Sequence, residues 1–358
     1  MSQPFKIRRR YALQLLGGAT SAALLHACGS NSGDSVESSD SAPDAADDAA
    51  TKELTMSLTL GTVPWIGQVP IYIAMEKGFY ADEGLDFSLN LFGSNGEYLS
   101  AFLSGQLEAI SPVSSEAVLL RSQGKDYKIV LVQDNSVGGD GILTTGGINS
   151  IEDFKGQKVA VDTAGVSYFF LLQVLKEAGL TKDDITVINT DAAAAAAAFQ
   201  SGNVDIAVTY APYLQQAADA VEDGKIIYDS SSMPTAIIDL YLFDTAFVEE
   251  NPETVQAFVN ATLRGLEYLE TNSEEALAIS AAELEVTPEE LAGDLEGVKL
   301  PDVDTNLKML ASPEDDLYLE EPMEDLATFL FAEGQIESEV SDFPALFDPQ
   351  FVQAYKDQ

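Results

Sequence analysis

Cysteine and histidine are almost absent from this sequence. The chain holds one of each, and both lie in the segment LLHACGS at residues 24–30. A chain without further cysteine or histidine has no disulfide, no Ser-His-Asp or Cys-His nucleophile system and no zinc site built from these residues. The sequence therefore favours a binding protein over an enzyme, and we expect neither a cofactor nor a metal.

Basic residues are also scarce. The 18 Lys and Arg stand against 59 Asp and Glu, which gives a formal net charge of −41. Such a surface repels nucleic acid and anionic lipid, so neither is an expected partner. The self-repulsion is screened at about 1 M salt, where the Debye length is roughly 3 Å. We therefore interpret the surface as halophilic; a protein that is merely acidic is the alternative.

The first 27 residues have the layout of a lipoprotein signal peptide. Basic residues within 6–10 precede an apolar run at 11–25, which is too short for a comfortable membrane span. The ending Leu-His-Ala-Cys at Cys28 resembles a lipoprotein box, and the arginines at 8–10 resemble a twin-arginine export signal. We expect an exported protein, lipid-anchored at Cys28 on the periplasmic or cell-surface face of the cytoplasmic membrane. A plain N-terminal helix is the alternative.

Residues 28–53 consist mostly of Ser, Asp, Ala and Gly, with almost nothing apolar. This composition cannot bury enough surface to fold, and its charges extend the segment. We expect an acidic disordered tether that reaches at most roughly 80 Å from the membrane.

One short pattern occurs twice in the part of the chain that is expected to fold. AFLSGQLEAI begins at residue 101 and AFQSGNVDIA at residue 198, and both read Ala-Phe-x-Ser-Gly-x-x-acid. The pattern predicts the end of a helix that packs its phenylalanine inward, a glycine in the left-handed conformation, and an acid at the start of the next strand. We therefore expect two α/β lobes built to one plan.

Each lobe is expected to be a mostly parallel sheet flanked by helices. Strands are predicted at 54–63, 85–92, 107–113 and 127–134 in the first lobe and at 156–162, 184–189 and 204–210 in the second, with helices between them. One more strand is predicted at 233–243, and acidic amphipathic helices without a further strand follow it and cover the first lobe. The first lobe comprises 54–143 and 235–358, and the second comprises 144–234.

Two lobes of this kind imply a cleft that closes on a small solute. In open parallel sheets the ligand lies beyond the carboxyl ends of the strands, at helix N-termini. The loops expected there are 63–69, 92–97, 111–116 and 134–141 in the first lobe and near the hinge, and 162–167, 189–192 and 209–213 in the second.

The segment VPWIGQVPIYIAMEKGFYADEGLDFSL, which starts at residue 63, resembles the beginning of the nitrate/sulfonate/taurine-type solute-binding proteins of ABC importers. The segments DNSVGGDGI, SIEDFKGQKVAVDTAGVSYFFLL, VDIAVTYAPYLQQA and IIDLYLFDTAFVEENPETVQAFV are similar to later parts of that family, in the same order. The resemblance implies a two-lobed periplasmic-binding-protein type II fold, with hinge crossings near 142–150 and 229–236.

The resemblance also implies ligand-facing residues in both lobes. Carried over position by position, these are Trp65, Gln68, Ser94, Asn95, Ser114, Ser115, Gly165, Val166, Ser167 and Tyr210. Trp65 is the only tryptophan and lies in a loop, where its ring can form a wall for the ligand; a core tryptophan at the end of the sheet is the alternative. The polar residues at 94–95 and 114–115 could equally be helix N-caps, a role that is compatible with binding.

The charged residues near the predicted cleft are all acidic. No Lys or Arg falls in the predicted loops, whereas Asp140 lies among glycines, Asp162 ends a strand of the second lobe and Asp239 lies on the returning strand. A carboxylate in a cleft favours an ammonium or amidine group. We therefore add Asp140 and Asp239 to the expected ligand-binding residues. Asp162 could be a solvated loop residue, and Asp140 and Asp239 could be structural parts of the hinge.

Together these features predict the extracytoplasmic solute-binding component of an ABC importer. It would act as a monomer, capture a small nitrogen- or sulfur-containing solute that resembles taurine or a sulfonate, and deliver it to a membrane permease with its ATPase. A binder of nitrate or bicarbonate, a binder of a thiamine precursor, and a ligand-sensing receptor partner are alternatives with the same fold. A pyrimidine-synthesising enzyme of this fold would need histidine and a cysteine-rich iron motif. The sequence after Cys28 contains neither residue type, so it disfavours this alternative.

Overall fold

A computed structural model of the chain describes residues 54–358. The predicted signal peptide at 1–27, the tether at 28–53 and the lipidation site Cys28 lie outside the described residues. Among residues 54–358, no helix combines the length and the apolar character that crossing a bilayer requires.

The first sheet has six strands in the order β11-β4-β10-β3-β1-β2. Their bounds are Met56–Thr62 (β1), Leu85–Leu91 (β2), Ala109–Ile110 (β3), Tyr127–Ser136 (β4), Ile238–Asp244 (β10) and Val298–Lys299 (β11). Strand β1 is parallel to β2 and β3, whereas β10 is antiparallel to β3 and β4, and β11 is antiparallel to β4. Strands β1 to β4 all run in one direction, whereas β10, which returns from the second lobe between β3 and β4, and β11 run in the opposite direction. The sheet is therefore mixed but mostly parallel, as predicted. The short β11 was not expected.

The second sheet has five strands in the order β7-β6-β8-β5-β9. Their bounds are Asp140–Thr144 (β5), Lys158–Val161 (β6), Thr186–Asn189 (β7), Ile206–Tyr210 (β8) and Lys225–Asp229 (β9). Strand β6 is parallel to β7 and β8, and β5 is antiparallel to β8 and β9, so this sheet is also mixed.

The two crossings between the sheets follow from these strands. The predicted boundary after residue 143 is wrong, because β5 pairs with β8 and therefore belongs to the second lobe. The first crossing lies between β4 and β5, at 137–139, and not at 142–150. The second crossing lies between β9 and β10, where the sequence places it.

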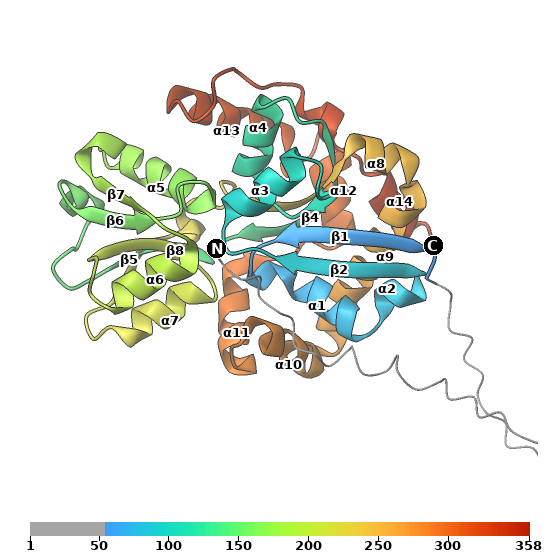
Figure 1. The fold of residues 1–358 in the computed structure, drawn as a ribbon, viewed down its shortest axis with the longest axis horizontal. Coiled ribbons are helices and arrows are strands. Elements are labelled where there is room, and N and C mark those ends of the chain that lie inside the picture. Colours follow the sequence, from blue (N-terminus) through green and yellow to red (C-terminus); the bar gives the residue numbers. More distant parts are fainter. Residues whose placement is uncertain (1–53) are drawn as a thin grey trace, which may run out of the picture. The chain divides into compact units, whose positions relative to one another are not determined.

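Helices cover both sheets (Figure 1). The first lobe has α1 (Val69–Glu76), α2 (Phe79–Asp82), α3 (Asn95–Leu103) and α4 (Ser114–Ser122), and the second has α5 (Val166–Glu177), α6 (Ala192–Gln200) and α7 (Tyr213–Ala220). The C-terminal helices are α8 (Thr245–Glu250), α9 (Pro252–Thr271), α10 (Ser273–Leu284), α11 (Pro288–Asp294), α12 (Val303–Ala311), α13 (Glu320–Ala332) and α14 (Gln350–Lys356). Helix α9 packs on α1, α13 packs on α4 and α14 packs on β4, so these helices cover the first lobe as predicted.

The two lobes follow one plan. The orders β2-β1-β3-β10 and β7-β6-β8-β5 correspond, and the repeated pattern joins α3 to β3 and α6 to β8. Phe102 and Phe199 are fully buried at the ends of these helices. Gly105 and Gly202 follow with φ angles of 71° and 70°, in the left-handed region that glycine adopts without a steric penalty. The interpretation of the repeat is therefore confirmed.

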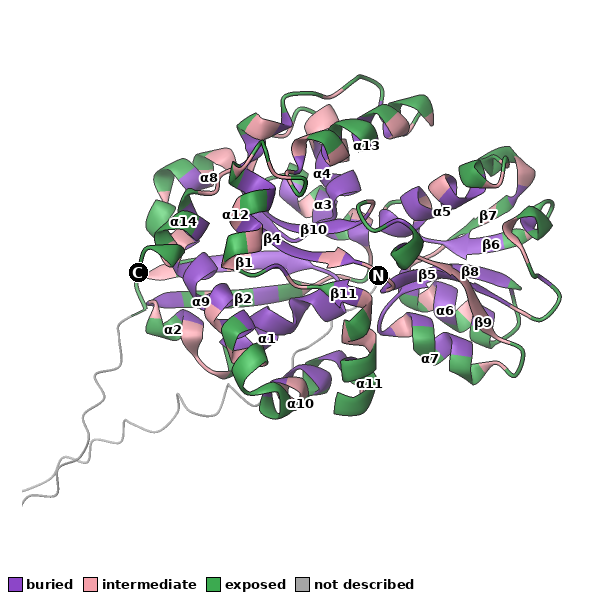
Figure 2. Ribbon diagram, turned by 180° about the vertical axis from the view of Figure 1, so that it is seen from behind, coloured by how far each residue is buried: buried purple, intermediate pink, exposed green. Residues whose placement is uncertain are grey.

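The strands of both sheets are mostly buried, and the exposed residues lie mainly on the helices and loops around them (Figure 2). One hydrophobic cluster contains residues of both lobes, among them Leu60 of β1 and Phe170 of α5. The apolar contacts of the two lobes are therefore continuous where the lobes meet.

Candidate functional site

A small cavity lies between the two lobes, at the carboxyl ends of β1, β3 and β8. The lining residues are Thr62, Val63, Trp65, Asn95, Tyr98, Ser111, Val113, Asp140, Val166, Tyr210 and Asp239. Its volume is about 20 Å³, which is room for one or two water molecules. A solute of several non-hydrogen atoms therefore requires the lobes to move apart.

Half of the predicted site residues meet at this cavity. They are Trp65, Asn95, Asp140, Val166, Tyr210 and Asp239. Ser94 instead borders an open groove along α3. Ser115 and Gly165 line a neighbouring groove between α4, α5 and α13. Gln68, Ser114 and Ser167 are buried and do not line the cavity.

Gln68 does not line the cavity but forms hydrogen bonds with two residues that do. Its Nε2 donates hydrogen bonds to Thr62 Oγ1 at 2.9 Å and to Ser111 Oγ at 3.1 Å, and both of these residues line the cavity. The hydroxyl of Ser111 donates in turn to Gln133 Oε1. The amide of Gln68 therefore orients two lining residues and does not face the cavity itself.

The expected helix caps are only partly present. The N-cap of α4 is Val113, so neither Ser114 nor Ser115 caps it, because the helix begins one residue earlier than a serine cap requires. Ser94 occupies the N-cap position of α3, but its side chain makes no capping hydrogen bond.

The sequence reasoning missed several residues around the cavity. Thr62, Val63, Tyr98, Ser111 and Val113 line it, and Glu116 lies directly behind them. Glu116 accepts hydrogen bonds from Asn95 Nδ2 at 2.6 Å, from the Tyr98 hydroxyl and from the Val113 backbone N–H at 3.2 Å. A signal for two of them existed, because Tyr98 follows Asn95 by one helical turn and Glu116 is an acid within a predicted cleft loop.

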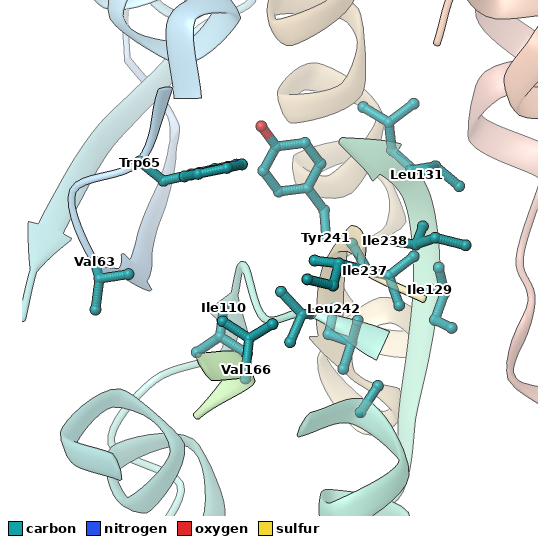
Figure 3. Close-up of a cluster of buried hydrophobic side chains, with 14 of the residues drawn as sticks. Val63, Trp65, Ile110, Ile129, Leu131, Val166, Ile237, Ile238, Tyr241 and Leu242 are labelled. Atoms are coloured by element: carbon teal, nitrogen blue, oxygen red, sulfur yellow. The ribbon is translucent and has the colours of Figure 1, made fainter. Parts of the chain in front are cut away.

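Trp65 combines both roles considered for it. The ring is 5% exposed and belongs to the hydrophobic core, and it also lines the cavity. Figure 3 shows it with Val63 of the same loop, Ile110 of β3 and Val166 of the second lobe. The ring meets Tyr210 of the second lobe edge-on, with 5.7 Å between the centroids and an angle of 88°. Its Nε1 donates to Asp134 Oδ2 at 2.8 Å.

Three buried aspartates gather beside the cavity. Asp134 of β4 lies opposite Asp239 of β10 in the strand register, and Asp140 begins β5 after the first crossing. Burial raises the pKa of Asp140 to about 7, although a hydrogen bond with Ser136 lowers it. Burial, and then the nearby charges of Asp134 and Asp140, raise the pKa of Asp239 well above its usual range.

The other acids around the site are buried too. Burial raises the pKa of Asp134, and the hydrogen bonds from Trp65 and Gln133 oppose this rise. Burial also raises the pKa of Glu116 to about 7. Asp162, for which a solvated loop position was the alternative, is buried, and its Oδ1 accepts from the Ala164 backbone N–H at 2.9 Å.

No basic side chain balances these acids at the cavity. None of the residues that line it is Lys or Arg. Within residues 54–358, no group of His, Cys, Asp and Glu is arranged to hold a metal ion. The site can therefore offer carboxylates, hydroxyls and aromatic faces to a small molecule.

Comparison with known proteins identifies the family of the chain and relatives that share its sequence. The family model described as NMT1/THI5 like matches residues 65–276. The taurine-binding periplasmic protein of Escherichia coli (strain K12) is 27% identical over 201 residues, which cover 54% of this chain and 61% of that protein. The chain thus aligns with less than two thirds of that relative.

Solved structures share the fold. The periplasmic aliphatic sulphonate-binding protein SsuA from Escherichia coli superimposes with a TM-score of 0.65 at 20% identity, over 80% of this chain and 95% of that one. The desulfurization enzyme DSZB superimposes with a TM-score of 0.60 at 15% identity, over 84% of this chain and 99% of that one. At these identities the likeness shows the fold alone, and the fold occurs both in a binding protein and in an enzyme.

Proposed function

The chain belongs to the NMT1/THI5-like family, and from this premise we propose that it is the extracytoplasmic solute-binding component of an ABC importer. It captures a small nitrogen- or sulfur-containing solute, similar to taurine or a sulfonate, between its lobes and delivers it to a membrane permease. The observation that carries this proposal is the cavity between the lobes, to which residues of both lobes contribute.

The architecture supports capture by lobe closure. The two sheets are joined only through the crossings near 137–139 and 230–237 and the contacts between the lobes, so a rotation at the crossings opens the cavity to solvent. Rotation of two rigid lobes about a few loop residues is the usual hinge motion of proteins that enclose a ligand. In the closed arrangement, Trp65 of the first lobe meets Tyr210 of the second.

The chemistry of the cavity supports a solute with an amino group. Asp140 and Asp239 can accept hydrogen bonds from an ammonium group. A sulfonate would be held by neutral donors and by helix N-termini, as at α5, whose first residue Val166 lines the cavity. The name of the taurine-binding relative agrees with a solute of this kind.

Partners and location follow from the same proposal. The protein would be monomeric, exported and lipid-anchored at Cys28, and would work with a permease and its ATPase and not with nucleic acid. We also propose that it is not an enzyme. Residues 54–358 contain neither cysteine nor histidine, so a cysteine nucleophile and histidine, the most frequent general base, are missing there.

Thermal unfolding in the presence of solutes tests the proposal. The full chain would be melted in about 2 M KCl, which screens its acidic surface, with taurine, ethanesulfonate, nitrate and bicarbonate. A solute at 100 times its dissociation constant stabilises the folded state by about 2.7 kcal/mol and raises the melting temperature by several degrees. The variant Trp65→Ala is expected to lose this rise. The absence of a rise with any solute would count against the proposal.

A further inference from the structure

We propose that the solute binds through a positively charged nitrogen, an ammonium or amidinium group, held by the carboxylates of Asp239 and Asp140. This inference rests on the proposed function and names the chemical class of the solute. The solute is an amine, either zwitterionic like taurine or purely cationic, and not a sulfonate or an oxyanion without such a nitrogen.

The first observation is the carboxylate of Asp239. The residue lines the cavity, is 7% exposed and lies at the start of β10, directly after the second crossing. Its Oδ2 is buried and has no hydrogen-bond partner. A buried polar atom without a partner is costly, and a buried charge without a partner is costlier still. An N–H group of a bound solute would provide the missing partner.

The second observation is the arrangement of the neighbouring acids. Asp134 lies opposite Asp239 in the strand register, and its Oδ1 is also buried without a partner. Asp140 lines the same cavity from the second lobe. No Lys or Arg lines the cavity, so no protein side chain there neutralises these carboxylates. One ammonium group supplies both a positive charge and three N–H donors.

The aromatic residues that line the cavity also favour a positively charged nitrogen. Trp65 and Tyr210 line the cavity together with Asp140 and Asp239, and a cation is attracted to the face of such rings. A metal ion is the other cation that carboxylates attract. Within the described residues, however, no acidic group has the arrangement of a metal site. A cationic nitrogen therefore fits the described site better than a metal ion does.

Three solutes with one carbon skeleton test the chemical class. Taurine carries an ammonium and a sulfonate, ethylamine only the ammonium, and ethanesulfonate only the sulfonate. Isothermal titration of the full chain in about 2 M KCl is expected to show binding of one or both amines and none of ethanesulfonate. Binding of ethanesulfonate as tight as that of taurine would overturn the inference and leave the proposed function standing. Failure of all three, and of nitrate and bicarbonate, would overturn both.

Two isosteric variants test the named residues. Asp239→Asn and Asp140→Asn keep the shape of each side chain and remove its charge, and each is expected to raise the dissociation constant of the amine at least about tenfold, the usual effect of losing a charged hydrogen bond. Asp86→Asn, at an exposed position of β2, makes the same change in net charge and should leave affinity unaltered. If Asp239 and Asp140 are only a structural pair, both variants will bind the amine as tightly as the parent chain.

Discussion

The indole Nε1 of Trp65 donates a hydrogen bond to Oδ2 of Asp134 at 2.8 Å, and both side chains are buried. This bond joins the loop after β1 to β4, the strand that leads into the first crossing. The same carboxylate oxygen accepts a weaker bond from Gln133 Nε2 at 3.2 Å. One ring thus forms a wall of the cavity and also holds an acid of the cluster behind it.

Replacing Trp65 by Phe should separate these two roles. The variant keeps an aromatic wall but removes the Nε1–H donor from a buried carboxylate, so we expect the free energy of unfolding to fall by about 1–3 kcal/mol. Chemical denaturation measures the loss. In an Asp134→Asn background the same replacement should cost less, because no charged acceptor remains. An equal cost in both backgrounds would show that the hydrogen bond is unimportant.

Gly67 should not tolerate a side chain. A Cβ at this position would lie 1.7 Å from Asp134 Oδ2 and 2.5 Å from Trp65 Nε1. We expect Gly67→Ala to break the bond between them and to lower the free energy of unfolding by about 1–3 kcal/mol, the usual range for overpacking. Gly147→Ala is the matched control, because a Cβ there meets nothing within 4 Å. Equal stability of the two variants would contradict the prediction.

The buried acids should make stability depend on pH. Burial raises the pKa of Asp140 and of Glu116 to about 7, whereas an unfolded carboxyl titrates near pH 4. Between these values the folded chain binds more protons than the unfolded chain, so its free energy of unfolding falls as pH rises from about 4 to about 7.

The measurement compares unfolding at several pH values in about 1 M KCl, where the surface repulsion is screened. Asp140→Asn should show a shallower fall over this range, because one of the titrating groups is gone. The groups that face Asp140 are Asp134, Asp239 and Tyr210, and none of them is basic. A variant with the same slope as the parent would contradict the assignment to this cluster.

Helix α13 of the first lobe contacts the second lobe through the side chain of Phe329. Its ring meets Phe169 of α5 edge-on, with 5.5 Å between the centroids, and Lys176 Nζ lies 4.8 Å from its centre. These contacts join the lobes in the closed arrangement, so Phe329→Ala should favour the open one. We expect a larger radius of gyration in small-angle scattering and several-fold weaker solute binding. Phe331→Ala, on the exposed side of the same helix, should change neither quantity.

Local sequence patterns predicted much of the fold. The alternation of strands and helices, the glycines at 105 and 202, and the inward Phe102 and Phe199 follow from short-range chemistry and are present in the structure. Half of the predicted site residues also meet at one cavity, because loops after parallel strands lie at the same edge of a sheet.

No local sequence pattern indicated which strands pair with each other. Whether β10 lies at an edge or between β3 and β4 depends on contacts between residues more than a hundred positions apart. For the same reason, the assignment of β5 to the second lobe was missed: its own residues do not indicate that it pairs with β8. The serines at 114–115 fit an N-cap by residue type, but the N-cap of α4 is Val113 and the helix begins at Ser114.

The sequence by itself determined the acidic charge, the two-lobed plan, the family resemblance and the absence of histidine and cysteine chemistry from the folded part. Only the tertiary structure decided that Asp140 and Asp239 line one cavity with Trp65 and that Asp134 lies beside them, with buried oxygens of Asp134 and Asp239 unpartnered. These aspartates come from three strands on both sides of the crossings. Burial and hydrogen bonding depend on how distant segments pack, and so they could not be read from the order of residues along the chain.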